Sequence, residues 1–175
     1  MRTPALLFMT LALVASCALA QEAPPAAAKP SDGYTVHVSA PHMVDGKVMG
    51  PYEHYCKVLT QDPIIVCQIY ESTDANAPMV QVEYIIGKKL TRNGKVTLAA
   101  WNKFWHDHKV EIATGRVKVL DLPPDKAKEV ADLVANTDGI IFDLWPHGAT
   151  LPDGSVRHPQ AVGHKNLKSL KEGAE

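Results

Sequence analysis

Two histidines separated by a single residue form the part of the sequence most suggestive of chemistry. They stand in the segment Trp105-His106-Asp107-His108. On a β-strand, side chains two positions apart point to the same side, so His106 and His108 could bind one metal ion. On a helix the two side chains would lie about 200° apart and could not share an ion. The segment falls where the sequence predicts a helix giving way to a strand, so both geometries stay open.

Two residues from earlier segments are candidates to complete a metal site with this pair. A catalytic zinc ion typically has three protein ligands from His, Asp, Glu or Cys, with water in the fourth position. The candidate ligands are His54, Glu83, His106 and His108. Zinc would activate water for hydrolysis, whereas copper would suit storage or redox chemistry. The sequence contains no HExxH or CxxC motif. In the alternative interpretation, the two neighbouring histidines are a structural polar pair beside the tryptophans.

The role of Glu83 depends on which face of its strand is buried. Residues 79–86 predict a strand whose even positions, from Val80 to Ile86, form an apolar face. Glu83 and Gln81 point the other way. If their face lies inside the protein, the carboxylate must be paired, coordinated or protonated. If that face is solvated, Glu83 is an ordinary surface residue.

The chain contains three cysteines, and two of them lie in the expected folded domain. An even number in an oxidising compartment suggests a disulfide, here between Cys56 and Cys67. The alternative is a pair of buried thiols, because free cysteine packs as a small hydrophobic side chain.

The first 20 residues predict a secretory signal segment. Met1-Arg2 supplies a positive charge, residues 6–15 are mostly apolar, and Ala18-Leu19-Ala20 is a typical cleavage sequence. In a second interpretation, Val14-Ala15-Ser16-Cys17 is a lipoprotein signal that ends before Cys17, which would then carry a lipid. Both interpretations predict an exported protein, in the periplasm or lipid-anchored in the cell envelope. The apolar run is shorter than the roughly 20 residues that a transmembrane helix needs.

Length and composition bound the rest of the chain. Residues 21–32 are rich in Pro and Ala and predict a flexible tether. We expect a single domain over 33–165 and a polar tail over 166–175. The 18 Lys and Arg against 19 Asp and Glu leave the chain nearly neutral, which gives no electrostatic case for nucleic acid as a partner.

Periodicity predicts an α+β fold: a single domain with an antiparallel sheet and two main helices packed on one face. Short loops between successive strands favour antiparallel pairing. Thr97 would cap one helix, over 98–105, and a second would begin at Pro124 and end near Asp138-Gly139. The expected strands are 34–40, 64–71, 79–86 and 140–145, with two more flanking Thr114-Gly115 within 109–120. Residues 41–51 predict a loop, and 52–59 a short helix.

Several short segments occur in an order that is more specific than any one of them. They are Glu53-His54-Tyr55-Cys56, Cys67-Gln68-Ile69-Tyr70-Glu71, Val82-Glu83-Tyr84-Ile85-Ile86, Trp105-His106-Asp107-His108, and Glu111 with Gly115. Between about Tyr34 and Val162 the chain thereby resembles the oil body-associated protein family. This family is catalogued largely as a domain of unknown function and includes plant seed proteins found with lipid droplets.

The resemblance implies that the four candidate ligands and both cysteines belong to the family's polar set, but it supplies no reaction. Because the plant members are not exported, it also leaves open a role for the cysteines other than a bridge. A lipid-droplet role does not transfer to a chain with a signal segment.

Two functions fit these observations. In the first, the chain is a non-enzymatic domain that binds a small ligand, a lipid or a protein partner, and the histidines are structural. In the second, it is a metal-binding protein or a metal-dependent hydrolase that uses the His/Glu cluster, with zinc or copper as the ion. The absence of a recognised catalytic motif favours the first, and whether the chain is an enzyme stays open.

Overall fold

The computed structural model describes residues 29–172. The expected signal segment, Cys17 and most of the expected tether lie outside this range, as do the last residues of the expected tail. Among the described residues, no helix is both long and apolar enough to span a membrane.

A single antiparallel sheet makes up most of the described part of the chain. Its strands lie in the order β5-β7-β4-β3-β2-β1-β6, and β8 pairs with β1. The strands are β1 (Val36–Val44), β2 (Lys47–Thr60), β3 (Ile64–Tyr70), β4 (Met79–Gly87), β5 (Trp105–Asp107), β6 (Lys118–Leu120), β7 (Thr137–Asp143) and β8 (Gln160–Ala161). The helices are α1 (Lys88–Thr91), α2 (Leu98–Phe104), α3 (His108–Ala113) and α4 (Pro124–Val134).

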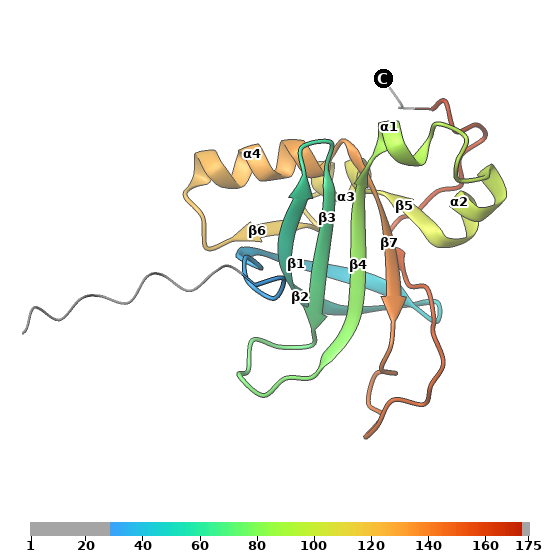
Figure 1. The fold of residues 1–175 in the computed structure, drawn as a ribbon. Helices are drawn as coiled ribbons and strands as arrows, with labels where there is room; N and C mark the ends of the chain where they lie inside the picture. The colour runs from blue at the N-terminus through green and yellow to red at the C-terminus, as the bar shows by residue number, and fades with distance from the viewer. Residues whose placement is uncertain (1–28, 173–175) are drawn as a thin grey trace, which may run out of the picture.

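The sheet is strongly curled. In Figure 1, β1 and the first part of β2 run across the direction of β3, β4 and β7, while the rest of β2 runs alongside β3, so the two ends of the sheet face different ways. Side chains from β1, β2, β4, α3 and α4 together line one cavity, which places these two helices over the inner side of the curl. The antiparallel sheet is therefore confirmed, but the domain is mostly sheet, and an α+β arrangement with two main helices on one face is supported only loosely.

The strands with clear alternation lie where the sequence predicts them. Strands β3 and β4 match the expected segments, and β3 is central, with β2 and β4 on its two sides. Helices α2 and α4 are also confirmed, but α4 ends at Val134, before the expected end near Asp138-Gly139, because residues 137–143 form β7. The Thr97 side chain accepts a hydrogen bond from the Ala100 backbone N–H and so caps α2, as expected.

Two predictions for residues 41–59 are wrong, because these residues belong to the hairpin of β1 and β2. Its tight turn contains Asp45 and Gly46, which both have positive φ, 49° and 76°. An Asp-Gly pair suits such a turn because its backbone twist matches that of the flanking strands. In β2, Tyr52, His54 and Cys56 are buried while the residues between them are partly exposed, which is the alternation of a strand rather than of a helix.

The expectation of two strands within 109–120 is half wrong. Residues 108–113 form helix α3, and only β6 is a strand. The Asp107 carboxylate accepts a hydrogen bond from the Lys109 backbone N–H and begins the helix, which overrides the strand preference of the β-branched residues that follow.

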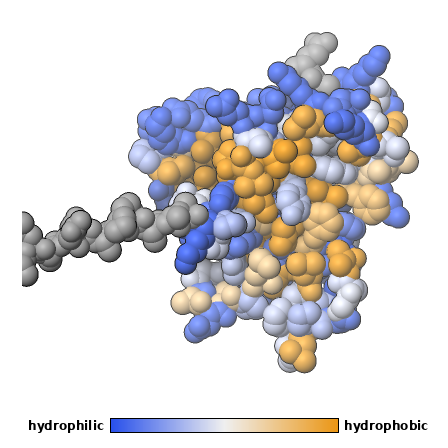
Figure 2. Space-filling model, in the orientation of Figure 1, coloured by the Kyte–Doolittle hydropathy of each residue, from blue (hydrophilic) through white to orange (hydrophobic). Residues whose placement is uncertain are grey.

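The core lies between the curled strands and includes both domain cysteines. Cys56 and Cys67 occupy directly paired positions of β2 and β3 and are joined as a disulfide. Buried apolar residues around them are Val44, Tyr52, Ile65, Ile69, Val80 and Ile85. On the opposite face, hydrophobic residues also gather over the sheet in the view of Figure 2, and Met79 and Tyr84 of β4 are 39% and 40% exposed.

His37 of β1 connects the edge of the sheet to its neighbours. Its Nδ1 lies 2.6 Å from Asp121 Oδ2, just after β6, and its Nε2 lies 2.9 Å from Glu53 Oε2 on β2. Burial alone would lower the pKa of His37, but hydrogen bonds to Asp121 and Glu53 raise it overall. The resulting stabilisation is fully present below the ordinary pKa of about 6.5 and is lost as the pH rises through the raised value.

We expect His37→Gln to lower the free energy of unfolding by about 1 kcal/mol at pH 6 and by much less at pH 9, as measured in urea. Ser39→Ala is the matched control, because Ser39 Oγ donates to Glu53 Oε1 at 3.2 Å and does not titrate in this range. Its effect should be the same at both pH values. An equal loss at both pH values for the His37 variant would contradict the assignment.

Candidate metal centre

The switch from β5 to α3 places His106 and His108 on the same side of the chain. Asp107, between them, is held on the other side, where its carboxylate lies 2.7 Å from Lys88 Nζ and 2.8 Å from Arg92 Nη2. His106 and His108 are 2% and 3% exposed. Their Nε2 atoms are 3.3 Å apart, so the strand-like geometry of this pair is the one that the fold adopts.

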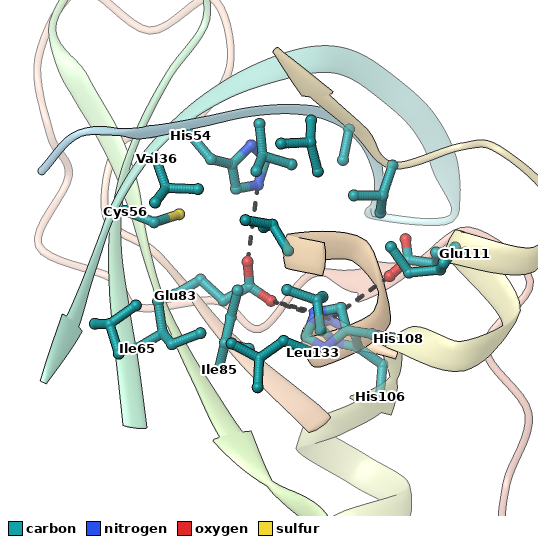
Figure 3. A pocket seen from close by; sticks show the side chains of 18 of the residues that line it. Val36, His54, Cys56, Ile65, Glu83, Ile85, His106, His108, Glu111 and Leu133 are labelled. Carbon is teal, nitrogen blue, oxygen red and sulfur yellow. Dashed lines mark hydrogen bonds and ion pairs between the residues drawn. The ribbon is translucent and has the colours of Figure 1, made fainter. Parts of the chain in front are cut away.

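Glu83 lies on the inner face of β4, between this pair and His54. Its Oε1 atom is 3.1 Å from His106 Nε2 and 3.2 Å from His108 Nε2, while its Oε2 atom is 3.8 Å from His54 Nε2. Figure 3 shows the carboxylate with His54 on one side and the other two histidines on the other. The fold therefore brings all four predicted ligands together, and Glu83 is buried, because Gln81, Glu83 and Ile85 of β4 point inward.

A fifth residue of the cluster, His42, was not among the predicted ligands. Its Nε2 atom lies 3.1 Å from His54 Nε2, and ligand atoms of His42, His54 and Glu83 all lie within 4.8 Å of one another. His42 follows Pro41 in a segment predicted as a loop. The signal that could have found it is Asp45-Gly46, a hairpin turn that pairs β1 with β2 and so brings His42 near His54.

Hydrogen bonds fix the orientation of His42 and His54. Nδ1 of His54 donates to the Tyr52 carbonyl oxygen at 3.0 Å, and Nδ1 of His42 donates to Gln81 Oε1 at 2.8 Å. Since these hydrogens are on Nδ1, each neutral ring presents the lone pair of Nε2 to the centre of the cluster. Both rings are buried, and burial lowers the pKa of both, that of His42 to about 3.

The ring of His108 is also oriented by a hydrogen bond at Nδ1. Its Nδ1 lies 3.0 Å from Thr137 Oγ1, and that hydroxyl donates its own hydrogen to the Val134 carbonyl oxygen at 2.6 Å. The Thr137 oxygen therefore accepts from Nδ1 of His108, and Nε2 faces Glu83. Such an outer hydrogen bond is typical of metal-bound histidines, whose ring orientation it fixes.

The charges of the cluster are strongly coupled. Burial would raise the pKa of Glu83, but hydrogen bonds from His106 and His108 lower it well below its usual value. Burial would lower the pKa of His108, but the Glu83 carboxylate raises it overall. Glu111 of α3 has an Oε2 atom 4.0 Å from His106 Nε2, and burial raises its pKa.

The spacing of three ligand atoms matches a face of a tetrahedron. A tetrahedral zinc ion with bonds of about 2.0–2.1 Å places its ligand atoms about 3.3 Å from one another. The three distances among Glu83 Oε1, His106 Nε2 and His108 Nε2 are 3.1, 3.2 and 3.3 Å. These three atoms could hold one ion and leave its fourth position open.

The cluster forms the polar end of an otherwise aliphatic cavity of about 60 Å³. One water molecule needs roughly 10–15 Å³ of such space, so the cavity could hold a few water molecules or a small ligand. Its aliphatic walls come from β1, β2, β6, α3 and α4 and include Val38, Val119, Ile112, Val130 and Leu133.

Gly139 of β7 gives the cluster room. It pairs with His106 across β5 and β7. A methyl group at this position would lie 2.3 Å from Glu83 Oε1 and 2.5 Å from His106 Nε2. The backbone of β7 thus forms the floor of the site, and no residue with a side chain fits there unless the cluster moves.

Fold and cluster together define a class: a curled antiparallel-sheet domain with a buried histidine–glutamate centre. The chain belongs to the family described as "Protein of unknown function (DUF1264)", which matches residues 28–168. The resemblance to oil body-associated proteins is confirmed by the relatives that this chain matches. No solved structure matches the chain.

The relatives are plant proteins. The chain is 32% identical to oil body-associated protein 1B of Arabidopsis thaliana over 112 residues, which cover 62% of this chain and 44% of that protein. It is 28% identical to oil body-associated protein 2C of the same plant over 128 residues, 70% of this chain and 52% of the relative. With oil body-associated protein 2A of Zea mays the identity is 31%, over 58% of this chain and 40% of the relative. The chain thus spans about half the length of these relatives.

We expect Gly139→Ala to lower the free energy of unfolding by about 1–3 kcal/mol, measured in urea, because the added methyl group overpacks the cluster. Gly87→Ala on β4 is the matched control, since its methyl group would meet Pro63 Cδ at 3.3 Å and needs only a small shift. Glu83→Ala should relieve part of the Gly139→Ala effect in a double variant. Equal stability of the two single variants would show that the cluster does not pack against Gly139.

Proposed function

We propose that this chain is a metal-binding domain whose ion is bound by Glu83 Oε1, His106 Nε2 and His108 Nε2. The observation that carries the proposal is the triangle of these three buried atoms, with sides of 3.1–3.3 Å. The outer hydrogen bond from His108 Nδ1 to Thr137 supports it. Zinc and copper suit imidazole and carboxylate ligands, and zinc fits a site with three protein ligands and an open position.

The competing explanation is a cluster held by protons alone. A buried carboxylate can be compensated by a charged imidazole, and the raised pKa of His108 beside Glu83 is the direction that such a pair would produce. A metal ion would compensate the same carboxylate without a proton. Measurement of bound metal separates the two explanations.

Export is a second part of the proposal. It rests on the signal-like residues 1–20, with cleavage after Ala20 or lipid attachment at Cys17 as the alternatives. The Cys56–Cys67 disulfide supports it, because disulfides persist mainly in oxidising compartments.

A small apolar ligand is the third part. The cavity is aliphatic except at the cluster, so it favours a ligand with a short hydrocarbon body and one oxygen group that reaches the ion. The plant relatives are named for oil bodies, and a ligand of lipid-like chemistry agrees with that name. We propose binding rather than turnover as the function.

Hydrolysis is the second candidate function, and Glu111 is the observation that favours it. This buried carboxylate lines the same cavity and lies 4.0 Å from His106 Nε2. A carboxyl group with a raised pKa beside a zinc-bound water could transfer protons during hydrolysis of a short ester.

We expect protein recovered from the periplasm of a Gram-negative host to contain at least one zinc or copper ion per chain by elemental analysis. His106→Ala/His108→Ala should remove at least one ion per chain while circular dichroism shows an intact fold. His147→Ala is the control, because this exposed histidine pairs with Glu71 and does not line the cavity. No metal in wild-type protein, and no uptake of zinc or copper on titration, would refute the metal site.

The same preparation tests export. Mass spectrometry should find a chain that begins at Gln21 or one that begins at a lipidated Cys17. Retention of the unprocessed chain in the cytoplasm would contradict the signal segment without affecting the metal site.

We expect butanoate to raise the melting temperature of the zinc-loaded protein, and Val119→Phe, which fills the cavity, to abolish this shift. Val48→Phe is the control, because Val48 is 58% exposed and lies outside the cavity. No shift at millimolar butanoate would contradict the proposed ligand class. Hydrolysis of p-nitrophenyl butanoate that is lost in Glu111→Gln would replace binding with catalysis as the function.

A further inference from the structure

His42 and His54 form a second pair of metal-type ligands that the site proposed above does not use. The two residues are 3% and 2% exposed, and their Nε2 atoms are 3.1 Å apart. Both Nδ1 hydrogens are donated to oxygen atoms that the fold fixes, the Tyr52 carbonyl and Gln81 Oε1. Two lone pairs therefore face each other in the protein interior, with no donor between them. A cation between the two atoms would turn this repulsion into binding.

Glu83 connects this second pair to the first. One carboxylate oxygen, Oε1, faces His106 and His108 at 3.1 and 3.2 Å. The other oxygen, Oε2, is 3.8 Å from His54 Nε2. Oε1 thus faces His106 and His108, and Oε2 faces His54, which contacts His42; a carboxylate placed in this way can bridge two ions.

We propose that the cluster binds two metal ions bridged by Glu83. The first is the ion of the proposed function, on which this inference rests. The second is bound by His42 Nε2, His54 Nε2 and Glu83 Oε2. Enzymes that use two ions hold them about 3.5–4 Å apart, a distance that one carboxylate can span.

The two positions differ in how completely the fold forms them. The ligand atoms of the first lie 3.1–3.3 Å apart, whereas the second includes the longer distance of 3.8 Å. The ligand atoms of His42, His54 and Glu83 lie within 4.8 Å of one another, so these side chains would have to move closer together to surround an ion. We therefore expect the first position to fill at lower metal concentration than the second.

The second position also lies on the cavity. His42, His54 and Glu83 all line it, together with the first pair of histidines. Glu83 and Glu111 are the carboxylates that line this cavity, so two divalent ions would carry more positive charge than these groups compensate. An anionic group of a ligand in the cavity, such as a carboxylate, could bind both ions and supply the missing negative charge.

Metal titration of the chelator-treated full chain tests the inference. We expect zinc to bind at two equivalents per chain, with the second equivalent weaker. His42→Ala and His54→Ala should each reduce this number to one, while His147→Ala leaves it at two. A single equivalent in wild-type protein that the His42 and His54 variants retain would overturn the second ion and leave the first intact. No binding at all would refute the proposed function itself.

Copper gives a measurement that needs no variant. Two Cu²⁺ ions about 4 Å apart interact magnetically, so the electron paramagnetic resonance signal should broaden and lose intensity per copper as the second equivalent is added. A signal that doubles without change of shape would place the second ion elsewhere and overturn the bridge. This result decides the question even if the histidine variants fail to fold.

Discussion

The rest of the structure depends on one buried carboxylate. Glu83 points into the curl of the sheet from β4, where 3% of the residue is exposed, and an unpaired carboxylate there would cost many kcal/mol. The groups that compensate it come from three other strands and from the start of α3. Residues that are distant in the sequence must therefore be brought together before the charge is stabilised, and a register shift of one residue in β4 would move Glu83 to the opposite face.

A second buried charge, on Asp138, links the strands and helices around the candidate ligands. Asp138 of β7 is 0% exposed and accepts hydrogen bonds from Arg92 Nε at 2.9 Å and Trp101 Nε1 at 3.0 Å. Arg92 also binds Asp107, so β5, β7 and α2 are fixed to one another on the side away from the histidines. Asp138 is followed directly by Gly139, so these ionic contacts fix the strand next to the residue that packs against the candidate metal centre. Removal of one partner from such a pair costs more than the pair contributes, because the remaining charge is left buried.

Part of this site could be predicted from the sequence because two of its residues are close together in the chain. His106 and His108 are two residues apart, and alternation on a strand was enough to suggest that they share a target. His42 could not be found in this way, since its partner His54 lies on another strand and the hairpin between them was interpreted as a loop and a helix. The sequence pattern also did not indicate which face of β4 points into the protein. The even positions of β4 are the more apolar, yet Tyr84, one of them, is 40% exposed, whereas Glu83 is 3% exposed.

A cluster that served only to stabilise the fold would satisfy its own hydrogen bonds, because each buried polar group left without a partner destabilises the protein. This cluster does not. His42 and His54 face each other with acceptor atoms, and among the described residues His106 Nδ1 has no hydrogen-bond partner. Both features lie beside a cavity, and the cluster packs against a glycine that has no side chain to displace it. Natural sequences depart from such local rules mainly at functional sites, and the departure here has the charge and geometry that a metal ion would correct.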